Sequence, residues 1–490
     1  ACVTETFAPG FRASPGAYVL SMIRPAVVRD LRLRARGLRV APGGPSLNVF
    51  SDGTTFTLHA ETGAAVEEIR RLDPRDARAF PGYEERLRTV AAILVPLTDR
   101  APFDPRVRRA TDVSELARIG LLAWRHRGEI TDAAYLFATS AARYLDERFR
   151  REELKAALGW ESISNTLAGP SSGGTAAGLL HEAASGASGG GLGWGFVAGG
   201  MGTVTQLMAD AAREAGARIL TGVEVERIRI TGGRATGVVL ADGTEMVADV
   251  VASNADPVRT YAGLVGEEHL PTRVVEAIRA YRITGASVKL NLAVAELPRL
   301  RGDGGSGVEL YHRGLIQLTK PLADLDADQA LARAGEAAPR PHLEVCVPSV
   351  HDPTLAPEGA HVVTVGARSQ PYRLEGTDWD AQRESVADRI VAQLGEAFPN
   401  LPGSILHREV LTPVDLERRL ALTGGHHLHG DMLPDQLYFL RPVRGYADYR
   451  TPVRGLYLCG AGTHPGGGVT GANGRNAAAV MIREARKGRR

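Results

Sequence analysis

A glycine-rich stretch near the end of the chain has the residue types that hold a large anionic cofactor. Residues 455–481 read GLYLCGAGTHPGGGVTGANGRNAAAVM, with six glycines between Gly460 and Gly471. Glycine lets the backbone approach a flat or charged ligand and accepts positive φ angles. We expect a strand at 456–459, a loop over 460–468 and a helix from about Thr470, whose N-terminus would attract an anion. A turn that needs only positive φ is the simpler alternative.

A second group of candidate ligands lies in the segment GGHHLHGD at 424–431. His427 and His429 would share one face if this segment were a strand, and three histidines with an aspartate could bind a metal ion. Neither a cysteine nor a distant pair of histidine and carboxylate residues completes such a site. We therefore favour the interpretation that the histidines bind no metal.

The sequence pattern of the helices and strands that would position a cofactor is clearest at residues 194–257. The GGMG turn at 199–202 precedes a helical period from Val204 to Ala215. We then expect a strand at 217–220, a hairpin formed by 223–230 and 234–240, and a strand over 245–252 that leads into Ser253. Such an α/β unit places its loops at the carboxyl ends of strands, where ligands of these folds bind.

The pattern of the remaining chain predicts a second domain that contains both helices and strands. Helical periods run through 62–158, and further helices are expected at 324–334 and 379–398. Alternating apolar residues predict a strand at 286–294, and another strand is expected at 342–347. The segment FRASPGAYVLSMIR at 11–24 combines small, aromatic and apolar residues, and we interpret it as buried chain that lines another part of the protein.

Composition narrows the function classes. The chain has 490 residues, which predicts two domains, and its net charge of +2 has no basic block that would bind nucleic acid. The cysteines Cys2, Cys346 and Cys459 are far apart, so no disulfide framework or redox pair is indicated, and we expect a reducing, cytoplasmic location. No apolar run is long enough to span a membrane, although peripheral membrane contact stays open. The start, ACVTETFAPGF, lacks the features of a signal peptide and reads as a cut end.

Three blocks together resemble the phytoene desaturase-like, flavin-dependent oxidoreductases: GGMG with its helix, ASNADP at 252–257, and GLYLCGAGTHPGGGVTG at 455–471. Within that family the chain is similar to the pyridine nucleotide-disulfide oxidoreductase domain-containing protein 2 group, also at 349–365 and 424–443. The resemblance implies an α/β fold, with a Rossmann-like FAD/NAD(P)-binding domain of glutathione-reductase or amine-oxidase type interleaved with an α+β substrate domain. The implied FAD-binding domain comprises 1–50, 191–275 and 445–490, and the substrate domain 51–190 and 276–444.

The resemblance also implies which residues contact FAD. Val225 matches the position where the backbone meets the adenine, and the loop 460–470 matches the strip along the ribityl chain and the isoalloxazine. The implied cofactor-binding residues are Thr4, Glu5, Gly200, Met201, Gly202, Val225, Ser253, Asn254, Gly460, Ala461, His464, Pro465, Gly466, Gly467, Gly468, Val469 and Thr470. No catalytic side chain is implied beyond the flavin itself.

The sequence departs from the family pattern at two places. The βαβ unit with GxGxxG, which should precede residues like Ala1–Glu5, is absent from this sequence, so the expected FAD domain lacks its N-terminal unit. Ala461 stands where relatives often have an acidic residue that binds a ribityl hydroxyl of FAD. We expect an FAD-dependent oxidoreductase that dehydrogenates or desaturates a hydrophobic substrate and passes electrons to an unidentified acceptor. The alternatives are a non-catalytic binding protein and an isomerase that uses reduced flavin.

Overall fold

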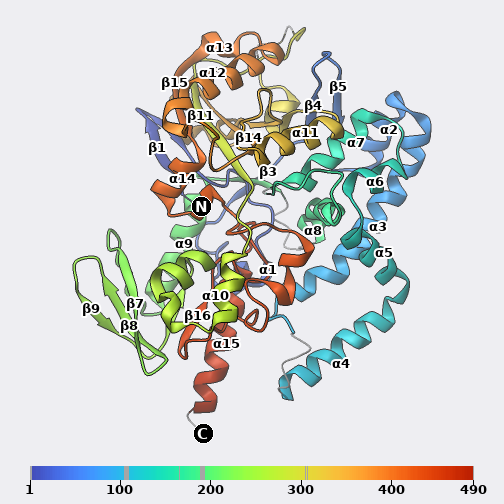
Figure 1. Cartoon of the computed structure of the whole chain (residues 1–490). Helices are drawn as coiled ribbons and strands as arrows, with labels where there is room; N and C mark the ends of the chain where they lie inside the picture. Colours follow the sequence, from blue (N-terminus) through green and yellow to red (C-terminus); the bar gives the residue numbers. More distant parts are fainter. Residues whose placement is uncertain are drawn as a thin grey trace.

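A seven-stranded mixed sheet lies in the upper part of the molecule (Figure 1). The computed structural model describes residues 3–103, 110–164, 166–187, 194–303, 305 and 307–488. The strand order in the sheet is β15-β11-β14-β13-β12-β4-β5. These strands are β4 (Ser46–Val49), β5 (Thr55–Leu58), β11 (Ala286–Val294), β12 (Ile316–Leu318), β13 (Leu343–Cys346), β14 (His361–Gln370) and β15 (Ile405–Leu411). The predicted strands at 286–294 and 342–347 are thus confirmed as β11 and β13.

The two faces of this sheet differ in character although both are buried. Strand β11 is buried at all nine positions. Because side chains alternate along a strand, Val288 and Leu290 lie on opposite sides of it from Lys289 and Asn291. The apolar side packs against α12 (Trp379–Ala397) in one large hydrophobic cluster. Figure 1 shows this helix along the upper side of the sheet.

The other face is polar, and its residues are set by the strand register. One row of directly paired positions crosses five strands. Its members are Lys289, Gly366, Glu344, Gln317 and Asn48. A buried polar face is stable only when its groups find hydrogen-bond partners. We call it the polar sheet face.

An ion pair at the centre of the polar sheet face supplies part of that compensation. The guanidinium of Arg368 donates to both carboxylate oxygens of Glu344, with Nε–Oε1 at 2.9 Å and Nη2–Oε2 at 2.6 Å. The hydroxyl of Tyr18 also donates to Glu344 Oε2. Burial alone would raise the pKa of Glu344, but Arg368 and Tyr18 outweigh it and hold that pKa below its usual value. Glu344 is therefore ionised at neutral pH.

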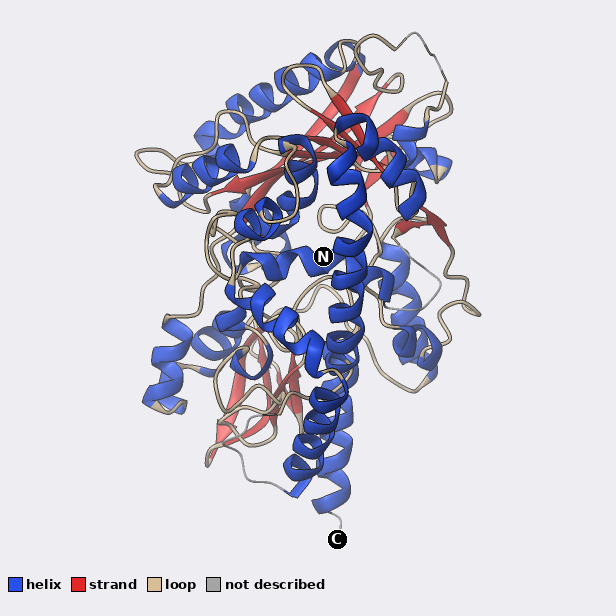
Figure 2. Cartoon of the chain, turned by 90° about the vertical axis from the view of Figure 1, so that its right-hand side faces the viewer, coloured by secondary structure: helices blue, strands red, loops and turns tan. Residues whose placement is uncertain are grey.

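Helices cover this region from the side of the polar face. Their apolar residues form one cluster that includes Phe80, Tyr144, Leu154 and Trp160. Figure 2 shows helices filling the middle of the molecule, with strands gathered above and below. The elements of this cluster are α2 (Thr62–Leu72), α3 (Pro74–Thr98), α5 (Arg127–Ala138), α6 (Ala141–Asp146), α7 (Glu152–Gly159), η1 (Trp160–Ile163), η2 (Thr175–Leu179), α8 (Leu180–Ala187) and α11 (Leu322–Arg333). Helix α4 (Ala110–Arg125) lies away from the sheet, at the lower right of Figure 1. The helical region predicted over 62–158 is confirmed.

The lower lobe holds smaller sheets. Strands β10 (Val251–Ser253) and β16 (Leu456–Leu458) pair in parallel, and a three-stranded sheet has the order β7-β8-β9.

Other elements, from both parts of the molecule, are β1 (Glu5–Ala8), β2 (Phe11–Ala13), α1 (Pro25–Asp30), β3 (Val40–Pro42), β6 (Gly195–Val197), α9 (Gly202–Glu214), β7 (Val225–Thr231), β8 (Arg234–Leu240), β9 (Glu245–Val247), η3 (Arg259–Val265), η4 (Glu267–His269), α10 (Thr272–Arg279), α13 (Leu401–Ser404), α14 (Pro413–Leu420) and α15 (Ala472–Gly488).

Most local predictions for the lower lobe are confirmed, but two strands differ. The helix after GGMG is α9, and the hairpin is β7–β8. The predicted strand at 217–220 is wrong: this segment pairs with no strand among the described residues, and Ile219 and Leu220 are 39% and 42% exposed. The strand predicted over 245–252 is split into β9 and β10. A strand pattern yields a strand only where a partner strand lies alongside.

The sheet also bears on the domain boundaries predicted from sequence. Strand β4 ends before residue 50 and so falls in the predicted FAD domain, yet it pairs with β5 and β12 in the seven-stranded sheet. The predicted boundary between residues 190 and 191 lies outside the described residues. Among the helices that are described, none has both the length and the apolar character to cross a bilayer.

Replacing Glu344 tests the stability of the polar sheet face. Because the folded-state pKa of Glu344 is depressed, its contribution to stability is present above the usual glutamate pKa and is lost as pH falls through the folded value. Glu344→Gln should lower the free energy of unfolding at neutral pH by about 3 kcal/mol, since Arg368 stays buried without its counter-charge. The variant should also lose less stability than wild type under acidic conditions. Urea unfolding at a series of pH values measures both effects.

Glu396→Gln is the matched control for this substitution. Glu396 pairs with Arg340 at 2.7 Å on the surface, where both side chains are about half exposed. Its loss should change the free energy of unfolding by at most about 1 kcal/mol. Equal effects of the two substitutions would show that the Glu344–Arg368 pair is not a stabilising element of the sheet.

Candidate functional site

The predicted strand, glycine-rich loop and helix are all present at the centre of the lower lobe. Strand β16 ends at Leu458, and helix α15 begins at Ala472, two residues beyond the expected start. Thr470 Oγ1 accepts a hydrogen bond from the Ala472 amide at 3.1 Å, as a capping residue does. Before the helix, Gly468 has φ of 98° and Val469 has φ of 57°. A β-branched residue in the left-handed region is strained, and such strain is typical of ligand-binding loops.

The buried side chain of Arg441 fixes the glycine-rich loop to the histidine-containing segment. Arg441 is fully buried, and no carboxylate of the described chain lies within ion-pair distance of it. Its nitrogens donate instead to backbone carbonyls, which are those of Ala461 at 3.0 Å, Leu428 at 2.8 Å, Asp431 at 3.1 Å, Gly430 at 3.2 Å and His429 at 3.4 Å. The loop around residue 461 and the segment 428–431 are therefore held together by one cation.

Two further side chains anchor the loop from the side of helix α15. Tyr449 donates its hydroxyl proton to the carbonyl of His464 at 2.7 Å. Asn473 Nδ2 donates to the carbonyls of Thr463 and His464 at 3.0 and 3.2 Å. His464 Nε2 lies 3.1 Å from the carbonyl of Leu97, and burial lowers the pKa of its imidazole to about 4. The side chain of His464 is therefore held in place by the protein, and the backbone of its loop is fixed from both sides.

The loop needs glycines because neighbouring protein atoms leave no room for a side chain at these positions. A Cβ atom at Gly460 would lie 2.2 Å from the carbonyl oxygen of Asn254. At Gly466 it would lie 2.3 Å from Met432 Cε, and at Gly467 it would lie 2.2 Å from Leu428 Cδ2. Of Gly467 and Gly468, only Gly468 has a positive φ. Gly467 is needed because Leu428 packs directly on its backbone.

The segment 11–24 runs beside this loop, as its composition suggested. The Arg24 amide donates to the carbonyl of Thr470 at 2.9 Å, and Met22 lies next to Gly468. Further back, the carbonyl of Gly16 accepts a hydrogen bond of 2.6 Å from Lys289 Nζ. The ammonium of Lys289 lies 5.3 Å from the centre of the Tyr18 ring. The segment therefore connects the glycine-rich loop with the polar sheet face.

Tyr18, His427 and Lys289 lie near one another where these parts meet. Tyr18 and His427 are half-buried, so each keeps some accessible surface. Burial and the nearby charges of Arg368 and Lys289 hold the pKa of His427 well below its usual value, so its imidazole is neutral. Burial lowers the pKa of Lys289 to about 8. We call the region bordered by Tyr18, His427 and Lys289 the enclosed space.

The other residues implied by the family resemblance lie in several places. Thr4 Oγ1 accepts a hydrogen bond from the Gly202 amide at 2.8 Å, and a Cβ at Gly200 would collide with Thr4. Glu5 points elsewhere, because its carboxylate pairs with Arg419 on the surface. Met201 is buried in a small cluster with Val204.

Ser253 and Val225 differ in their surroundings. The carbonyl of Ser253 accepts from the Cys459 amide at 2.8 Å, so Ser253 borders the start of the glycine-rich loop. Its hydroxyl lies 2.8 Å from that of Thr260. Val225 opens strand β7 and is 36% exposed. Its assignment to the adenine site stays a prediction.

The histidine segment does not form the strand that a shared face would require. Residues 424–431 form a turn with irregular backbone, and His429 has φ of 56°. His426 Nδ1 accepts from the amides of Leu428 and Gly430, and its Nε2 lies 3.3 Å from Asp431 Oδ1. The expectation that His427 and His429 share a strand face is wrong. His426 instead fixes the turn that carries His427.

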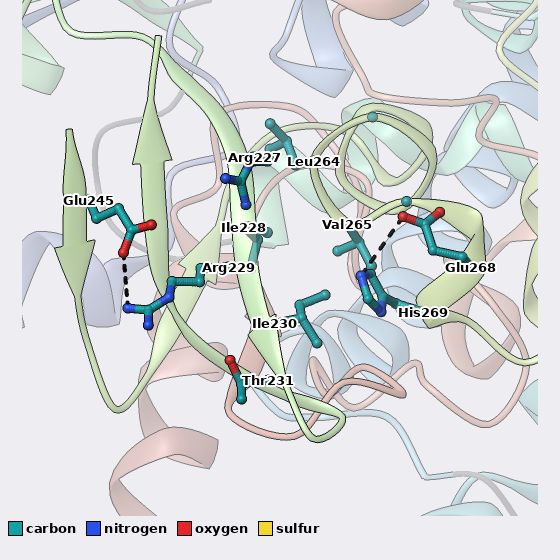
Figure 3. A pocket seen from close by; sticks show the side chains of 12 residues that line it. Arg227, Ile228, Arg229, Ile230, Thr231, Glu245, Leu264, Val265, Glu268 and His269 are labelled. Carbon is teal, nitrogen blue, oxygen red and sulfur yellow. Dashed lines mark ion pairs between the residues drawn. The ribbon is translucent and has the colours of Figure 1, made fainter. Parts of the chain in front are cut away.

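A surface groove lies away from this site. It has a volume of about 430 Å³ between β7 and the η3–η4 segment (Figure 3). Figure 3 shows two pairs at its margins, Arg229–Glu245 at 3.3 Å between β7 and β9, and His269–Glu268 at 3.8 Å within η4. None of its lining residues comes from the glycine-rich loop. We therefore do not regard this groove as the main site.

The residues at the enclosed space fit a flat, anionic cofactor. A strained backbone precedes a helix N-terminus, whose dipole would stabilise negative charge by about 0.3 to 2 kcal/mol. The ammonium of Lys289 adds a positive charge without a carboxylate partner among the described residues. Sequence reasoning missed Arg441, Lys289, Tyr18 and the Glu344–Arg368 pair. Lys289 could have been noticed, because it interrupts an otherwise apolar and amide-bearing strand.

Comparisons with known proteins identify a similar family and a similar fold. The family model described as "Flavin containing amine oxidoreductase" matches residues 26–482. A mouse protein named pyridine nucleotide-disulfide oxidoreductase domain-containing protein 2 is 36% identical, with 99% of this chain and 87% of the relative covered. A lycopene-forming phytoene desaturase of Paracoccus is 28% identical over 59% of this chain and 54% of its own length. An oxidoreductase from Methanosarcina mazei has a similar fold, with a TM-score of 0.61, 16% identity, and coverage of 98% and 90%.

Gly467→Val tests whether the loop and the histidine segment together form a flavin site. The valine side chain would overlap Leu428 and push the adjoining His427 out of place. We expect the affinity for FAD to fall at least tenfold, measured by quenching of FAD fluorescence. Thermal unfolding should also shift to lower temperature, since overpacking typically costs about 1 to 3 kcal/mol.

The control is Gly82→Ala in helix α3, at an exposed position with open space around it. This substitution should stabilise the helix by up to about 1 kcal/mol and leave FAD affinity unchanged. Unchanged FAD affinity in Gly467→Val would show that the loop is only a structural turn.

Proposed function

The chain belongs to the family of flavin-containing amine oxidoreductases, and we propose that it is an FAD-dependent oxidoreductase that dehydrogenates a hydrophobic substrate. The observation that carries the proposal is the enclosed space between the glycine-rich loop and the polar sheet face. A cofactor at this place would have a fixed, strained backbone on one side and a charged sheet on the other. The family membership supports a flavin cofactor, and the closeness of the glycine-rich loop to the polar sheet face supports this place for it.

Several residues would hold the cofactor. The backbone of 466–470 and the N-terminus of α15 would face its flavin, and Met22 and Leu428 would border it. When bound, FAD accepts a hydride from the substrate, which is the chemistry that the protein itself lacks. The substrate would reach the cofactor from the side of the polar sheet face.

The chain's own side chains would exclude water, supply a positive charge and accept a proton. Tyr18 and His427 are half-buried and would border the cofactor on the substrate side, where they would help to exclude water. Lys289 would contribute a positive charge near Gly16. Removal of a hydride from a substrate leaves a proton to be taken up, and the neutral imidazole of His427 is able to accept it.

The proposal is tested by adding FAD to the purified protein. We expect stoichiometric binding with quenched fluorescence, and we expect anaerobic addition of hydrophobic substrate candidates, phytoene among them, to bleach the flavin absorbance. His427→Asn should slow this reduction about a hundredfold without loss of FAD, since positioned acid–base groups typically contribute that much.

His407→Asn, at an exposed position of strand β15, is the matched control and should reduce at the wild-type rate. A protein that shows no saturable FAD binding would contradict the proposed function. Substrate turnover that needs prereduced flavin and bleaches none of it would favour the isomerase alternative.

A further inference from the structure

Helix α4 turns an apolar side away from the protein. Val113, Leu116, Leu121 and Trp124 are 68%, 53%, 48% and 65% exposed. Because an α-helix has about 3.6 residues per turn, positions spaced in this way lie on one side of the helix. We call these four side chains the apolar stripe. A surface helix normally buries such a side, so a contiguous exposed stripe indicates an interaction site.

An ion-pair network on the opposite side of α4 holds the helix in this orientation. The carboxylate of Glu115 accepts from Arg118 Nε at 2.9 Å and from Arg100 Nη1, which precedes the helix, at 3.1 Å. Leu122 lies on the same side as Glu115 and Arg118, and all three are half-buried. The charged side of α4 therefore contacts the rest of the protein, and the apolar stripe faces solvent.

Helix α4 is also placed where a large flat surface would reach it. Figure 1 shows the helix at the lower right edge of the molecule, apart from both lobes of strands. Among the described helices none is long and apolar enough to cross a bilayer. A helix with one apolar side that does not span a membrane is able to lie in the plane of the membrane surface.

Two arginines at the end of the apolar stripe provide a charge that matches an anionic membrane. Arg125 and Arg127 are exposed, and neither pairs with a carboxylate of the described residues. The guanidinium of Arg127 lies 6.0 Å from the centre of the Trp124 ring. Tryptophan is enriched at membrane–water interfaces, and arginine extends its charge to lipid headgroups while its stem stays in apolar surroundings. The end of α4 thus has the residue types of an interfacial anchor.

The size of the apolar stripe favours a membrane over a second copy of the chain. A stable protein–protein interface takes about 20 to 30 residues from each partner, with close matching of shape. The apolar stripe offers four large side chains on one helix. A bilayer needs no matching shape, because each apolar side chain that enters it contributes independently.

We propose that the apolar stripe of α4 docks the protein on the surface of an anionic lipid membrane. The stripe enters the boundary between headgroups and acyl chains, and Arg125 and Arg127 lie at the lipid phosphates. The inference does not rest on the proposed function, but it bears on it. A hydrophobic substrate is concentrated in the bilayer, so docking places the protein at the source of such a substrate.

Cosedimentation of the full chain with vesicles of phosphatidylcholine and phosphatidylglycerol tests the proposal. The wild-type protein should bind, and Leu116→Glu should bind at least about tenfold more weakly, because a carboxylate is excluded from the apolar boundary and repelled by the headgroups. Leu406→Glu is the matched control: Leu406 is 52% exposed on the edge strand β15, at the other end of the molecule (Figure 1). The control should bind like wild type. Absence of wild-type binding, or equal binding by both variants, would overturn the proposal.

Two further variants keep the test sharp if Leu116→Glu does not fold. Arg125→Gln combined with Arg127→Gln should weaken binding to the mixed vesicles about tenfold and leave the weaker binding to pure phosphatidylcholine unchanged. Trp124→Phe keeps an apolar side chain and should bind within about threefold of wild type. The wild-type tryptophan fluorescence should shift to shorter wavelength on vesicle addition, and Trp124→Phe should lose that shift. A shift that persists in Trp124→Phe would place the membrane contact elsewhere and refute the assignment.

Sedimentation equilibrium distinguishes a membrane from a second copy as the occupant of the stripe. Wild type and Leu116→Glu should have the same molar mass in solution. A wild-type dimer that Leu116→Glu dissociates, without vesicle binding, would show that the stripe joins two copies and would overturn the proposal. Vesicle binding is measured without substrate and read separately from FAD titration, so its failure leaves the proposed function standing.

Discussion

The guanidinium of Arg441 is a cation buried without a carboxylate partner among the described residues, and this constraint orders the centre of the molecule. A buried charge is tolerated only when its donors are satisfied, and here backbone carbonyls satisfy them. Those carbonyls belong to the segment 428–431 and to Ala461 in the glycine-rich loop. Arg441 therefore holds the segment 428–431 and the glycine-rich loop at one place. Their contact brings Leu428 onto Gly467.

The seven-stranded sheet contributes the opposite wall because its two faces have different partners. Packing on α12 demands apolar residues on one side of β11, β13 and β14. The other side carries Lys289, Glu344 and Arg368, whose burial is compensated by an ion pair and by the backbone of the segment 11–24. Such a face is stable only where its polar groups find partners. Its location beside the strained loop is the physical reason to regard both as parts of one site.

Much of the secondary structure was predictable from sequence, and the chemistry of the site was predictable only in part. The strand at 286–294 and the cap of α14 follow from local patterns, since Thr412 and Asp415 form a capping box. The loop at 460–470 was recognisable from its glycines. The role of Gly467 was not, because Leu428 is its neighbour only in the folded chain. The same is true of Arg441, whose partners are backbone atoms that carry no sequence signature, and of the strand expected at 217–220, which lacks a neighbouring strand.

The central claim is that the enclosed space between the glycine-rich loop and the polar sheet face is the flavin site. A crystal structure of the protein with FAD tests this most directly. The account predicts isoalloxazine density bordered by Gly467, Met22 and Leu428, with Lys289 and His427 on the substrate side. Flavin density in the surface groove between β7 and η3, or at any place not in contact with residues 466–470, would contradict it.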